Sequence, residues 1–472
     1  MSAFLTAGSA RTPRLAMRPG DAAELLLTSA WLLDPSIDLE GPHDLLIREG
    51  RIAEIAPPET LEPAPGTEIL DATGLHVFPG FVDPHVHFRT PGREDEEDLD
   101  SGTRAAAAGG FCCVLAMPNT DPVLDNASVL RSLRERGNLE ARVPVGFLAA
   151  ASRGQAGREL TEMAELSDDG AAGFTDDGMP ITDAGLVRQA LQYQRLCGGV
   201  LALHEEDPLL SRTGVMHEGA VSTLLGLAGI PSISESTMVE RDCAIARYEG
   251  GRCHMLHLSC AESVSAVERG RDSGAQVTAE VTPHHLTLTD DAVRSLDPRF
   301  KMNPPLRTER DRDALIAGLR SGVIDCIATD HAPHAREEKE VPFEQAPMGV
   351  TGLETAFAVL YTDLVLPGVL ELSVLVERLT AGASVYGLPL PSLAPDSPAN
   401  LCLVDLENVW KVGESGYESR SDNSCFAERK LQGKVIMTVA AGAVAFRERS
   451  FAIRLAEDPD RAGRLTGSRH DR

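Results

Sequence analysis

Eight short apolar segments, each followed by a stretch of helical character, recur between about residues 75 and 380. Continuous apolar runs of this length are typical of strands that are buried on both faces of a parallel sheet. Eight successive β/α units predict a (β/α)8 barrel of the TIM type. A doubly wound open sheet is the competing architecture, but no glycine-rich dinucleotide-binding loop opens the pattern. We therefore expect an α/β fold whose largest domain, residues 75–390, is this barrel.

The two ends of the chain have a different pattern, in which short β-rich runs alternate with turns. Near the start, Glu49-Gly50-Arg51 separates two such runs and predicts a hairpin. Near the end, Gly442 lies in a turn between two further runs. We expect residues 21–74 and 391–450 to form one small β domain together.

The outermost segments differ again in composition. Residues 1–20 contain three arginines and no Asp or Glu, and residues 451–472 are rich in arginine. We expect both to be disordered extensions. A transit peptide is the alternative interpretation of the first segment.

The composition restricts the classes of function. The 44 Lys and Arg residues against 71 Asp and Glu residues give a formal net charge of -27. Such an acidic surface repels nucleic-acid phosphates and anionic lipids, and no apolar run reaches the roughly 18 residues of a membrane-spanning helix. The nine cysteines show no C-x-x-C spacing, which indicates reduced thiols rather than disulfides. We expect a cytoplasmic protein without nucleic-acid or membrane partners.

The segment Asp83-Pro84-His85-Val86-His87 is the strongest local signal. On a strand, residues two apart point to the same side, so His85 and His87 can share one metal ion. More polar residues follow the ends of later apolar runs, where a barrel has its active site. They are Asn119, Asp177, His204, His257 and Asp330. Imidazoles and carboxylates together suit zinc or a similar metal, and an aspartate can bridge two ions.

Motifs spread over about residues 72–390 carry a family resemblance. They read GFVDPHVHFRTPG, GGFCCVLAMPNTDPV, FTDDGMPI, LHEED, AEVTPHHLTLT, KMNPPLR, DCIATDHAPHAREEK and PMGVTGLETA. With them the chain resembles the amidohydrolase superfamily and, more closely, the dihydroorotases of the bacterial class I type. The flanking β segments are similar to the composite β-sandwich of that family. The resemblance implies a hydrolase with a small-molecule substrate, which interconverts N-carbamoyl-L-aspartate and L-dihydroorotate in pyrimidine biosynthesis.

The resemblance also implies two zinc ions per subunit, with a single ion as the alternative. His85, His87 and Asp330 would hold one ion, His204 and His257 the other, and Asp177 would bridge them. Asp176 is the adjacent candidate for the bridge. Hydantoinases and allantoinases use a carbamylated lysine there, but residues 166–185 contain no lysine. Asp330 would act as general base and then general acid for a hydroxide held between the ions.

The substrate-binding residues implied by the resemblance are His87, Arg89, Asn119, Asn303, His334, Met348 and Gly349. Arg89, Asn119 and His334 would hold the α-carboxylate, because a guanidinium group can form paired hydrogen bonds with a carboxylate. Taken alone, Asn119 could equally be a turn residue. The family usually has an acidic residue in place of Thr90, which leaves the metal ligands untouched but puts the geometry of the loop beside Arg89 in question. It commonly has an aromatic residue in place of Met348.

Two alternatives to a catalytic dihydroorotase stay open. One is a cyclic amidase of the hydantoinase or allantoinase type. The other is a non-catalytic homologue that serves as a structural partner of aspartate carbamoyltransferase, a role that could also coexist with catalysis. A homo-oligomer, most simply a homodimer, is expected. We interpret His284-His285 as residues that pack or support the site, and the charged run 336–340 as a solvated loop, with a mobile loop near the pocket as the alternative.

Overall fold

The computed structural model describes residues 12–448. Within this range, eight parallel strands form the barrel: β6 (Phe81–Val86), β7 (Phe111–Ala116), β8 (Val145–Phe147), β9 (Phe174–Thr175), β10 (Leu201–Leu203), β13 (Arg252–Met255), β14 (Gln276–Val281) and β15 (Cys326–Ile327). The hydrogen-bonded orders are β6-β7-β8 and β9-β10-β13-β14-β15. Parallel bridges from Ala149 to Phe174 and from Val86 to His331 join the two groups. The strands therefore close into the predicted (β/α)8 barrel.

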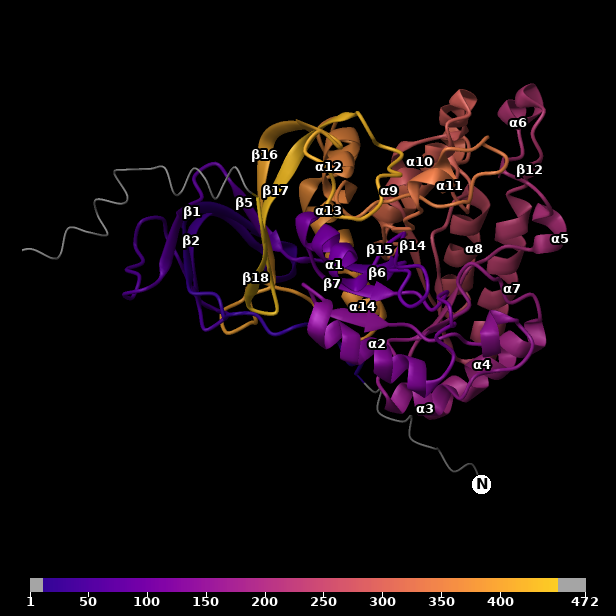
Figure 1. Ribbon diagram of the computed structural model, residues 1–472, viewed down its shortest axis with the longest axis horizontal. Coiled ribbons are helices and arrows are strands. Elements are labelled where there is room, and N and C mark those ends of the chain that lie inside the picture. Colours follow the sequence, from indigo (N-terminus) through magenta and orange to yellow (C-terminus); the bar gives the residue numbers. More distant parts are fainter. Residues whose placement is uncertain (1–11, 449–472) are drawn as a thin grey trace, which may run out of the picture.

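Helices surround these strands, as Figure 1 shows. The longer ones are α1 (Leu99–Ala108), α2 (Ala127–Glu140), α4 (Ala184–Cys197), α7 (Ile233–Glu249), α8 (Ala261–Asp272), α10 (Glu309–Ser321) and α13 (Leu372–Thr380). Shorter ones are α3 (Met163–Asp168), α5 (Pro208–Ser211), α6 (Ala220–Leu225), α9 (Pro283–Thr287), α11 (Arg336–Lys339), α12 (Ala356–Leu360) and α14 (Gly382–Val385). The small strands β11 (Met216–His217) and β12 (Gly229–Ile230) pair beside α6. Side chains cap the N-termini of several helices, as Asp98 does for α1 and Thr308 for α10.

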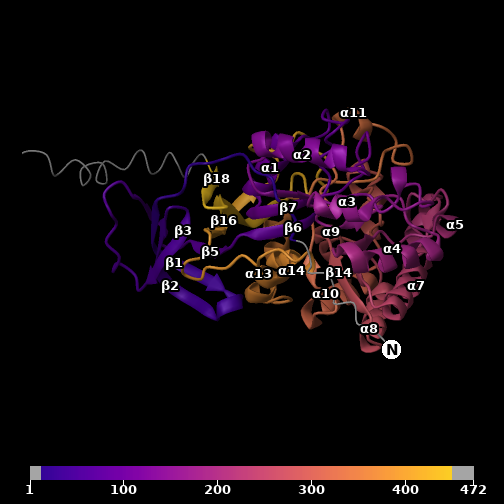
Figure 2. The same cartoon turned by 90° about the horizontal axis from the view of Figure 1, so that it is seen from below.

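Both ends of the chain contribute to one sheet of eight strands, which lies to one side of the barrel (Figures 1 and 2). Its strands are β1 (Leu25–Asp34), β2 (Leu39–Arg48), β3 (Arg51–Ala56), β4 (Glu68–Asp71), β5 (His76–Pro79), β16 (Leu401–Lys411), β17 (Lys430–Ala440) and β18 (Ala443–Arg447). They are hydrogen-bonded in the order β18-β17-β16-β5-β1-β2-β3, and β4 pairs with β1.

The sheet curls around a hydrophobic core of its own. Leu27 of β1, Ile47 of β2, Leu403 of β16 and Met437 of β17 all belong to one buried cluster. Strands far apart in the order can share a core only if the sheet bends over on itself, as it does in a sandwich. The predicted hairpin is also present, since β2 and β3 pair antiparallel around the turn at Glu49-Gly50.

The structure differs from the expectation for the first 20 residues. Residues 12–20 run along the outside of the barrel, where Ala16 pairs antiparallel with Val145 and is 1% exposed. Gly137 allows this close approach, because a Cβ atom there would lie 2.8 Å from the Cβ of Ala16. This contact could not be predicted from the sequence, because Val145 and Gly137 lie more than 100 positions further along the chain. Residues 1–11 and the predicted tail 451–472 lie outside the described residues.

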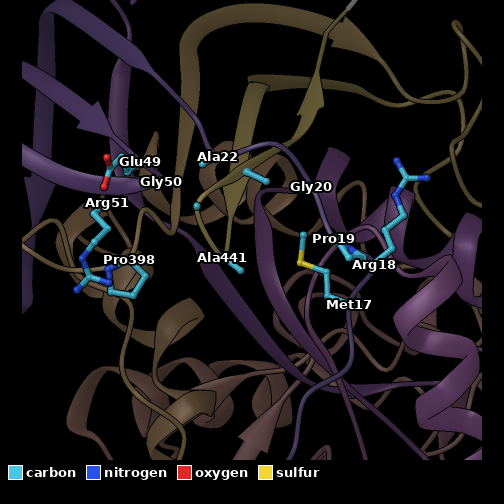
Figure 3. A pocket seen from close by; sticks show the side chains of 12 residues that line it. Met17, Arg18, Pro19, Gly20, Ala22, Glu49, Gly50, Arg51, Pro398 and Ala441 are labelled. Atoms are coloured by element: carbon cyan, nitrogen blue, oxygen red, sulfur yellow. The ribbon is translucent and has the colours of Figure 1, made fainter.

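A hollow of about 430 Å³ lies between this N-terminal segment and the turns of the sheet. Figure 3 shows Met17 to Gly20 on one side of it and Glu49 to Arg51 with Pro398 on the other. None of the predicted site residues lines it.

Two further expectations concern cysteines and membrane helices. All nine cysteines are free and buried. Burial raises the pKa of thiols such as Cys113 and Cys243 to about 12, so they stay protonated at neutral pH. Among residues 12–448, no helix is both long and apolar enough to span a membrane.

Candidate metal centre

The six residues predicted to hold metal all lie where barrel strands end. His85 is the second-last residue of strand β6 and His87 follows the strand directly. The other four, Asp177, His204, His257 and Asp330, come one to three residues after β9, β10, β13 and β15. All six are buried, with at most 6% of the residue exposed. The carboxyl ends of parallel strands meet at one end of the barrel, so residues spread over nearly 250 positions converge there.

The carboxylate of Asp177 lies between two pairs of histidines. Its Oδ2 atom is 3.5 Å from Nε2 of His85 and 3.4 Å from Nε2 of His87. Its Oδ1 atom is 3.4 Å from Nδ1 of His204 and 3.4 Å from Nε2 of His257. Metal–ligand bonds of about 2.0–2.1 Å in a tetrahedron separate neighbouring ligand atoms by roughly 3.3–3.4 Å. Each oxygen is thus spaced from its histidine pair as two ligands of one ion would be.

Asp330 lies with the first of these pairs. Its Oδ1 atom is 3.1 Å from Nε2 of His87 and 3.4 Å from Nε2 of His85. His85, His87 and Asp330 therefore form a compact three-residue group, and His85, Asp177 and His257 form another.

Several atoms that face this centre have no hydrogen-bond partner among the described residues. They are His85 Nε2, Asp177 Oδ1 and His204 Nδ1. A buried polar atom without a partner costs about 1–3 kcal/mol, so a native protein seldom leaves three of them together. Nitrogen and oxygen atoms arranged in this way can hold metal ions, and the residues present fit such a group.

The neighbouring Asp176 points elsewhere. Its carboxylate accepts a hydrogen bond of 2.9 Å from the backbone N–H of Ser152 and a second one from the Ser152 hydroxyl. Burial raises the pKa of Asp176 to about 6, and these bonds offset only part of that effect. Of the two candidates for the bridging position, only Asp177 faces the histidines.

The electrostatics of the centre keep its carboxylates ionised. Burial alone would raise the pKa of Asp177, but His85, His204 and His257 hold it well below its usual value. Burial would likewise lower the pKa of His85, but Asp177, Glu280 and Asp330 raise it well above its usual value. Ionised carboxylates are the form that binds metal.

Three residues at this end of the barrel have backbone angles that side chains rarely adopt. Arg89 has φ 55°, His257 has φ 29° and Asp330 has φ 48°. Such left-handed conformations cost about 1–3 kcal/mol for most residues and persist only where the surroundings enforce them. Here all three residues come two or three positions after the ends of β6, β13 and β15.

Glu280 is a site residue that the sequence analysis missed. Its Oε1 atom lies 2.6 Å from Nδ1 of His85, and its Oε2 atom lies 3.0 Å from Nε2 of His254. Burial opposes the charge, but His85 and His254 lower the pKa of Glu280 to about 2. A carboxylate in this position fixes the orientation of a metal-binding imidazole. The available signal was a lone charged residue inside the buried strand β14.

Two more carboxylates support the ends of the strands. Asp83 accepts hydrogen bonds from the backbone N–H of His85 (3.1 Å) and from the hydroxyl of Thr329 (2.5 Å), which ties β6 to the residue before Asp330. Glu206 lies 3.3 Å from Nε2 of His204, on the side of the ring opposite Asp177. Both carboxylates were missed because neither follows a spacing rule that the sequence reveals.

The predicted substrate-binding residues surround the same centre. Asn119 Oδ1 is 2.8 Å from Nδ1 of His87, on the far side of the ring from Asp330. Asn303 donates a hydrogen bond of 2.6 Å to Glu206 and lies 3.4 Å from Nε2 of His204.

Arg89, His334, Met348 and Gly349 form the neighbouring part of the rim. Nε of Arg89 donates to the carbonyl of Pro333 at 3.1 Å, and Nε2 of His334 lies 2.8 Å from the carbonyl oxygen of Met348. Gly349 has φ 134°, and a Cβ atom there would come within 2.9 Å of the His334 ring. Only glycine therefore fits between these loops.

The departure from the family pattern at Thr90 is met by another acidic residue. Thr90 is buried, and its hydroxyl has no hydrogen-bond partner among residues 12–448. Glu96 instead places Oε2 3.0 Å from Nε of Arg89. Arg89 thus has a carboxylate partner even though position 90 does not supply one.

The charged run 336–340 is only in part the solvated loop that we expected: Arg336, Glu337 and Glu340 are exposed, but the run contains a short helix and one buried lysine. Residues 336–339 form α11, and Lys339 is only 8% exposed. Its ammonium group donates to the carbonyl oxygens of Pro347 (2.8 Å), Pro298 (3.2 Å) and Lys301 (3.3 Å). The prediction failed at Lys339 because three carbonyls from other loops can satisfy a buried ammonium group without any carboxylate. His284 and His285 are both buried, in line with their interpretation as packing residues.

Comparison with known proteins gives these observations a family context. A family model described as Dihydro-orotase-like matches residues 74–263. The dihydroorotase of Pelotomaculum thermopropionicum is 44% identical over 427 residues, which cover 90% of this chain and 99% of the relative. The dihydroorotase of Anaeromyxobacter dehalogenans is also 44% identical, over 90% of this chain and 98% of its own.

Among solved structures, the L-hydantoinase of Arthrobacter aurescens superposes with a TM-score of 0.79 and 25% sequence identity. The match covers 89% of this chain and 96% of the hydantoinase. Barrel and composite β domain are therefore shared with cyclic amidases, while the higher sequence identity lies with dihydroorotases. Identity of 44% across nine-tenths of the sequence confirms the resemblance seen in the motifs, and the chain belongs to the dihydroorotase family.

Proposed function

We propose that the protein catalyses the reversible cyclisation of N-carbamoyl-L-aspartate to L-dihydroorotate and water, at a centre that binds two zinc ions. The observation that carries the proposal is the position of Asp177, whose two oxygens each face a separate pair of histidines. One carboxylate thereby takes the bridging place that a carbamylated lysine occupies in hydantoinases, and residues 166–185 contain no lysine. Membership of the dihydroorotase family supports the same reaction.

His85, His87 and Asp330 would hold the first ion, His204 and His257 the second, and Asp177 would contact both. Imidazole nitrogens and carboxylate oxygens in tetrahedral spacing are a donor set that zinc prefers. Two such ions, when bound, would supply an activated water molecule at neutral pH and polarise the amide carbonyl of the substrate. Glu280 orients His85 and Glu206 orients His204, each through the ring nitrogen that does not face Asp177.

Asp330 would move the proton. Burial alone would raise its pKa, but His85 and His87 lower it, so the carboxylate is ionised and can accept a proton at neutral pH. In ring opening, Asp330 would take the proton of the attacking water and deliver it to the ring nitrogen as the C–N bond breaks. In ring closure the same proton would travel in the opposite direction.

The rim residues would recognise the substrate. Arg89, Asn119 and His334 would bind the carboxylate on the ring, because they place cationic and amide groups beside the centre. Asn303 and the backbone around Met348-Gly349 would contact the ring itself. His87, held by Asn119, would join the metal site to this pocket.

A second candidate function is ring opening of hydantoins or dihydropyrimidines. The observation in its favour is the structural likeness to L-hydantoinase. Without a lysine at the bridge, and with the partly buried Arg89 at the rim, the site suits a carboxylate-bearing ring better.

The oligomeric state and partners are proposals from the resemblance only: a cytoplasmic homodimer, able to associate with aspartate carbamoyltransferase. Light scattering of the protein alone and in a mixture with that enzyme tests both points.

The deciding experiment measures metal content and turnover on the same preparation. Zinc-loaded protein should contain about two ions per chain, close L-dihydroorotate from N-carbamoyl-L-aspartate at mildly acidic pH and open it at alkaline pH. Hydantoin, allantoin and dihydrouracil are the comparison substrates. Faster turnover of any of these three than of L-dihydroorotate would favour the cyclic amidase alternative. No turnover of any substrate by fully loaded protein would favour the non-catalytic alternative.

A further inference from the structure

A segment of the C-terminal β domain reaches into the rim of the active site. It consists of residues 418–424 and belongs to the long connection between β16 and β17, which extends from the sheet toward the barrel (Figure 1). Ser419, Ser421, Asn423 and Ser424 are all buried there, with at most 7% of each residue exposed. A run of small polar residues buried in this way needs specific partners.

The partners of Asn423 are the two loops that carry the proposed substrate contacts. Its side-chain oxygen accepts a hydrogen bond from the backbone N–H of His334 at 3.3 Å. Its amide nitrogen donates to the carbonyl oxygens of Ala332 at 3.4 Å and Gly349 at 3.2 Å. Both N–H groups and the oxygen of the amide are therefore used, so that one side chain joins the loop of His334 to the loop of Met348-Gly349.

These two loops are in direct contact, so a small increase in their separation would break that contact. His334 Nε2 lies 2.8 Å from the carbonyl oxygen of Met348, and there is no room for a Cβ atom at Gly349. Ser421 adds a second connection, because its hydroxyl lies 2.8 Å from the carbonyl oxygen of His334 and 2.7 Å from that of Glu96. Glu96 in turn pairs with Arg89. The segment thus contacts the surroundings of both Arg89 and His334.

The same segment makes no contact with the six residues of the metal centre in any hydrogen bond recorded for the described chain. Two carboxylates instead anchor its start: Glu354 accepts from the backbone N–H groups of Glu418 and Ser419 at 3.0 and 3.1 Å, and Glu97 accepts from that of Arg420 at 3.2 Å. The hydrogen bonds of the segment therefore go to the rim loops and not to the metal-binding side chains themselves.

We propose that Asn423 is a positioning residue that sets the spacing between His334 and Met348-Gly349, so that the C-terminal β domain determines the affinity for rings that carry a carboxylate. The inference rests on the proposed function, because it assigns these loops to the substrate. It adds a residue 89 positions beyond His334 that would not touch the substrate itself.

The test replaces Asn423 by Asp, which has almost the same size. The variant keeps an oxygen for the N–H of His334 but places a second oxygen against the carbonyls of Ala332 and Gly349, and repulsion should part the loops. Asn423→Ser is the second variant, since it removes the amide without adding charge. Ser424→Ala is the matched control: Ser424 is equally buried in the same segment, but its hydroxyl accepts only from the N–H of Phe426.

We expect both Asn423 variants to raise the KM for L-dihydroorotate and its Kd by roughly tenfold or more. The kcat should change by less than about threefold, with the zinc content unchanged. The kcat/KM for dihydrouracil, which has no carboxylate, should fall by a clearly smaller factor, because only the contacts between Met348-Gly349 and the ring are disturbed. The Ser424→Ala control should leave all of these values unchanged.

The outcomes separate this inference from the function on which it rests. If the wild type turns over L-dihydroorotate and both Asn423 variants keep its KM and Kd while only their melting temperature falls, Asn423 merely stabilises the fold and the inference is wrong. Equal losses for dihydroorotate and dihydrouracil would also overturn it. If zinc-loaded wild type neither binds nor converts L-dihydroorotate, the proposed function fails and the inference fails with it.

Discussion

Glu280 and His85 form the tightest link between the metal centre and the barrel interior: Oε1 of Glu280 lies 2.6 Å from Nδ1 of His85, and both side chains are fully buried. The other oxygen of Glu280 contacts His254, which also lies in the interior at 2.8 Å from the Thr278 hydroxyl. A hydrogen at Nδ1 leaves Nε2 of His85 with a free lone pair, and Nε2 is the atom that faces Asp177 and Asp330. Glu280 therefore selects the ring form of His85 that can bind metal.

We expect Glu280→Gln to lower zinc affinity by about 10- to 100-fold, the usual effect of losing a carboxylate behind a metal-binding histidine. Titration against a chromogenic chelator measures the affinity directly, without reference to turnover. Gln276→Ala is the control, because Gln276 lies on the same strand with its side chain exposed. Equal affinities for Glu280→Gln and wild type would mean that the metal does not depend on the orientation of His85.

Asp177→Ala should abolish tight binding of both ions and reduce turnover together with metal content. The reason is that Asp177 is the single side chain shared by both histidine pairs. Asp176→Asn is a closely matched control, since Asp176 faces Ser152 and its pKa of about 6 already makes the neutral form accessible. Elemental analysis of the folded variants measures the metal content. Full metal content in Asp177→Ala, or loss of metal in Asp176→Asn, would mean that Asp176 and not Asp177 bridges the two ions.

Replacing Asp330 by Asn should separate chemistry from metal binding. The amide keeps one oxygen near His87 but cannot accept a proton. General acid–base groups typically contribute 10²–10⁴-fold, so turnover should fall by roughly a hundredfold or more while part of the metal remains. Single-turnover rates normalised to bound zinc are the measurement. A normalised rate close to wild type would show that another group moves the proton, and His334 would be the next residue to replace.

Much of this site followed from the sequence, and the reason is geometric. Strands of a parallel barrel all end at one rim, so polar residues after apolar runs, such as His204 and Asp330, must converge whatever the details of packing. Glu280 and Asn423 could not be found in this way. Their partners, His85 and Gly349, lie 195 and 74 positions away, and only the folded barrel brings them together. The same holds for Lys339, whose three carbonyl partners carry no side-chain signature.

The lowered pKa of the buried Lys339 should make the stability of the fold depend on pH. Burial, with a smaller contribution from Lys301, lowers its pKa to about 7 from an ordinary value of 10.5. Below pH 7 both the folded and the unfolded chain carry this proton. Between about pH 7 and 10.5 the unfolded chain binds it more strongly, so the free energy of unfolding should rise with pH through this window.

Denaturant unfolding of wild type and Lys339→Met at pH 6.5 and pH 9 tests this point. The stability of the wild type relative to the variant should increase between the two pH values. Lys430→Met, at an exposed position, should track the wild type at both. A wild-type advantage that stays constant or shrinks toward pH 9 would contradict a depressed pKa at Lys339.

Arg89 should decide between substrates that differ only in the carboxylate. Dihydrouracil is the ring of dihydroorotate without that group, so the metal centre treats both amides alike and only the rim can tell them apart. One charge-assisted hydrogen bond contributes about 1.5–3 kcal/mol, which corresponds to roughly 10- to 150-fold. Arg89→Met should therefore lower kcat/KM for L-dihydroorotate by at least tenfold and leave that for dihydrouracil almost unchanged. Arg269→Met, on the exposed face of α8, is the control. If wild type opens dihydrouracil as readily as dihydroorotate, or if Arg89→Met slows both equally, Arg89 does not bind the carboxylate and the cyclic amidase alternative gains support.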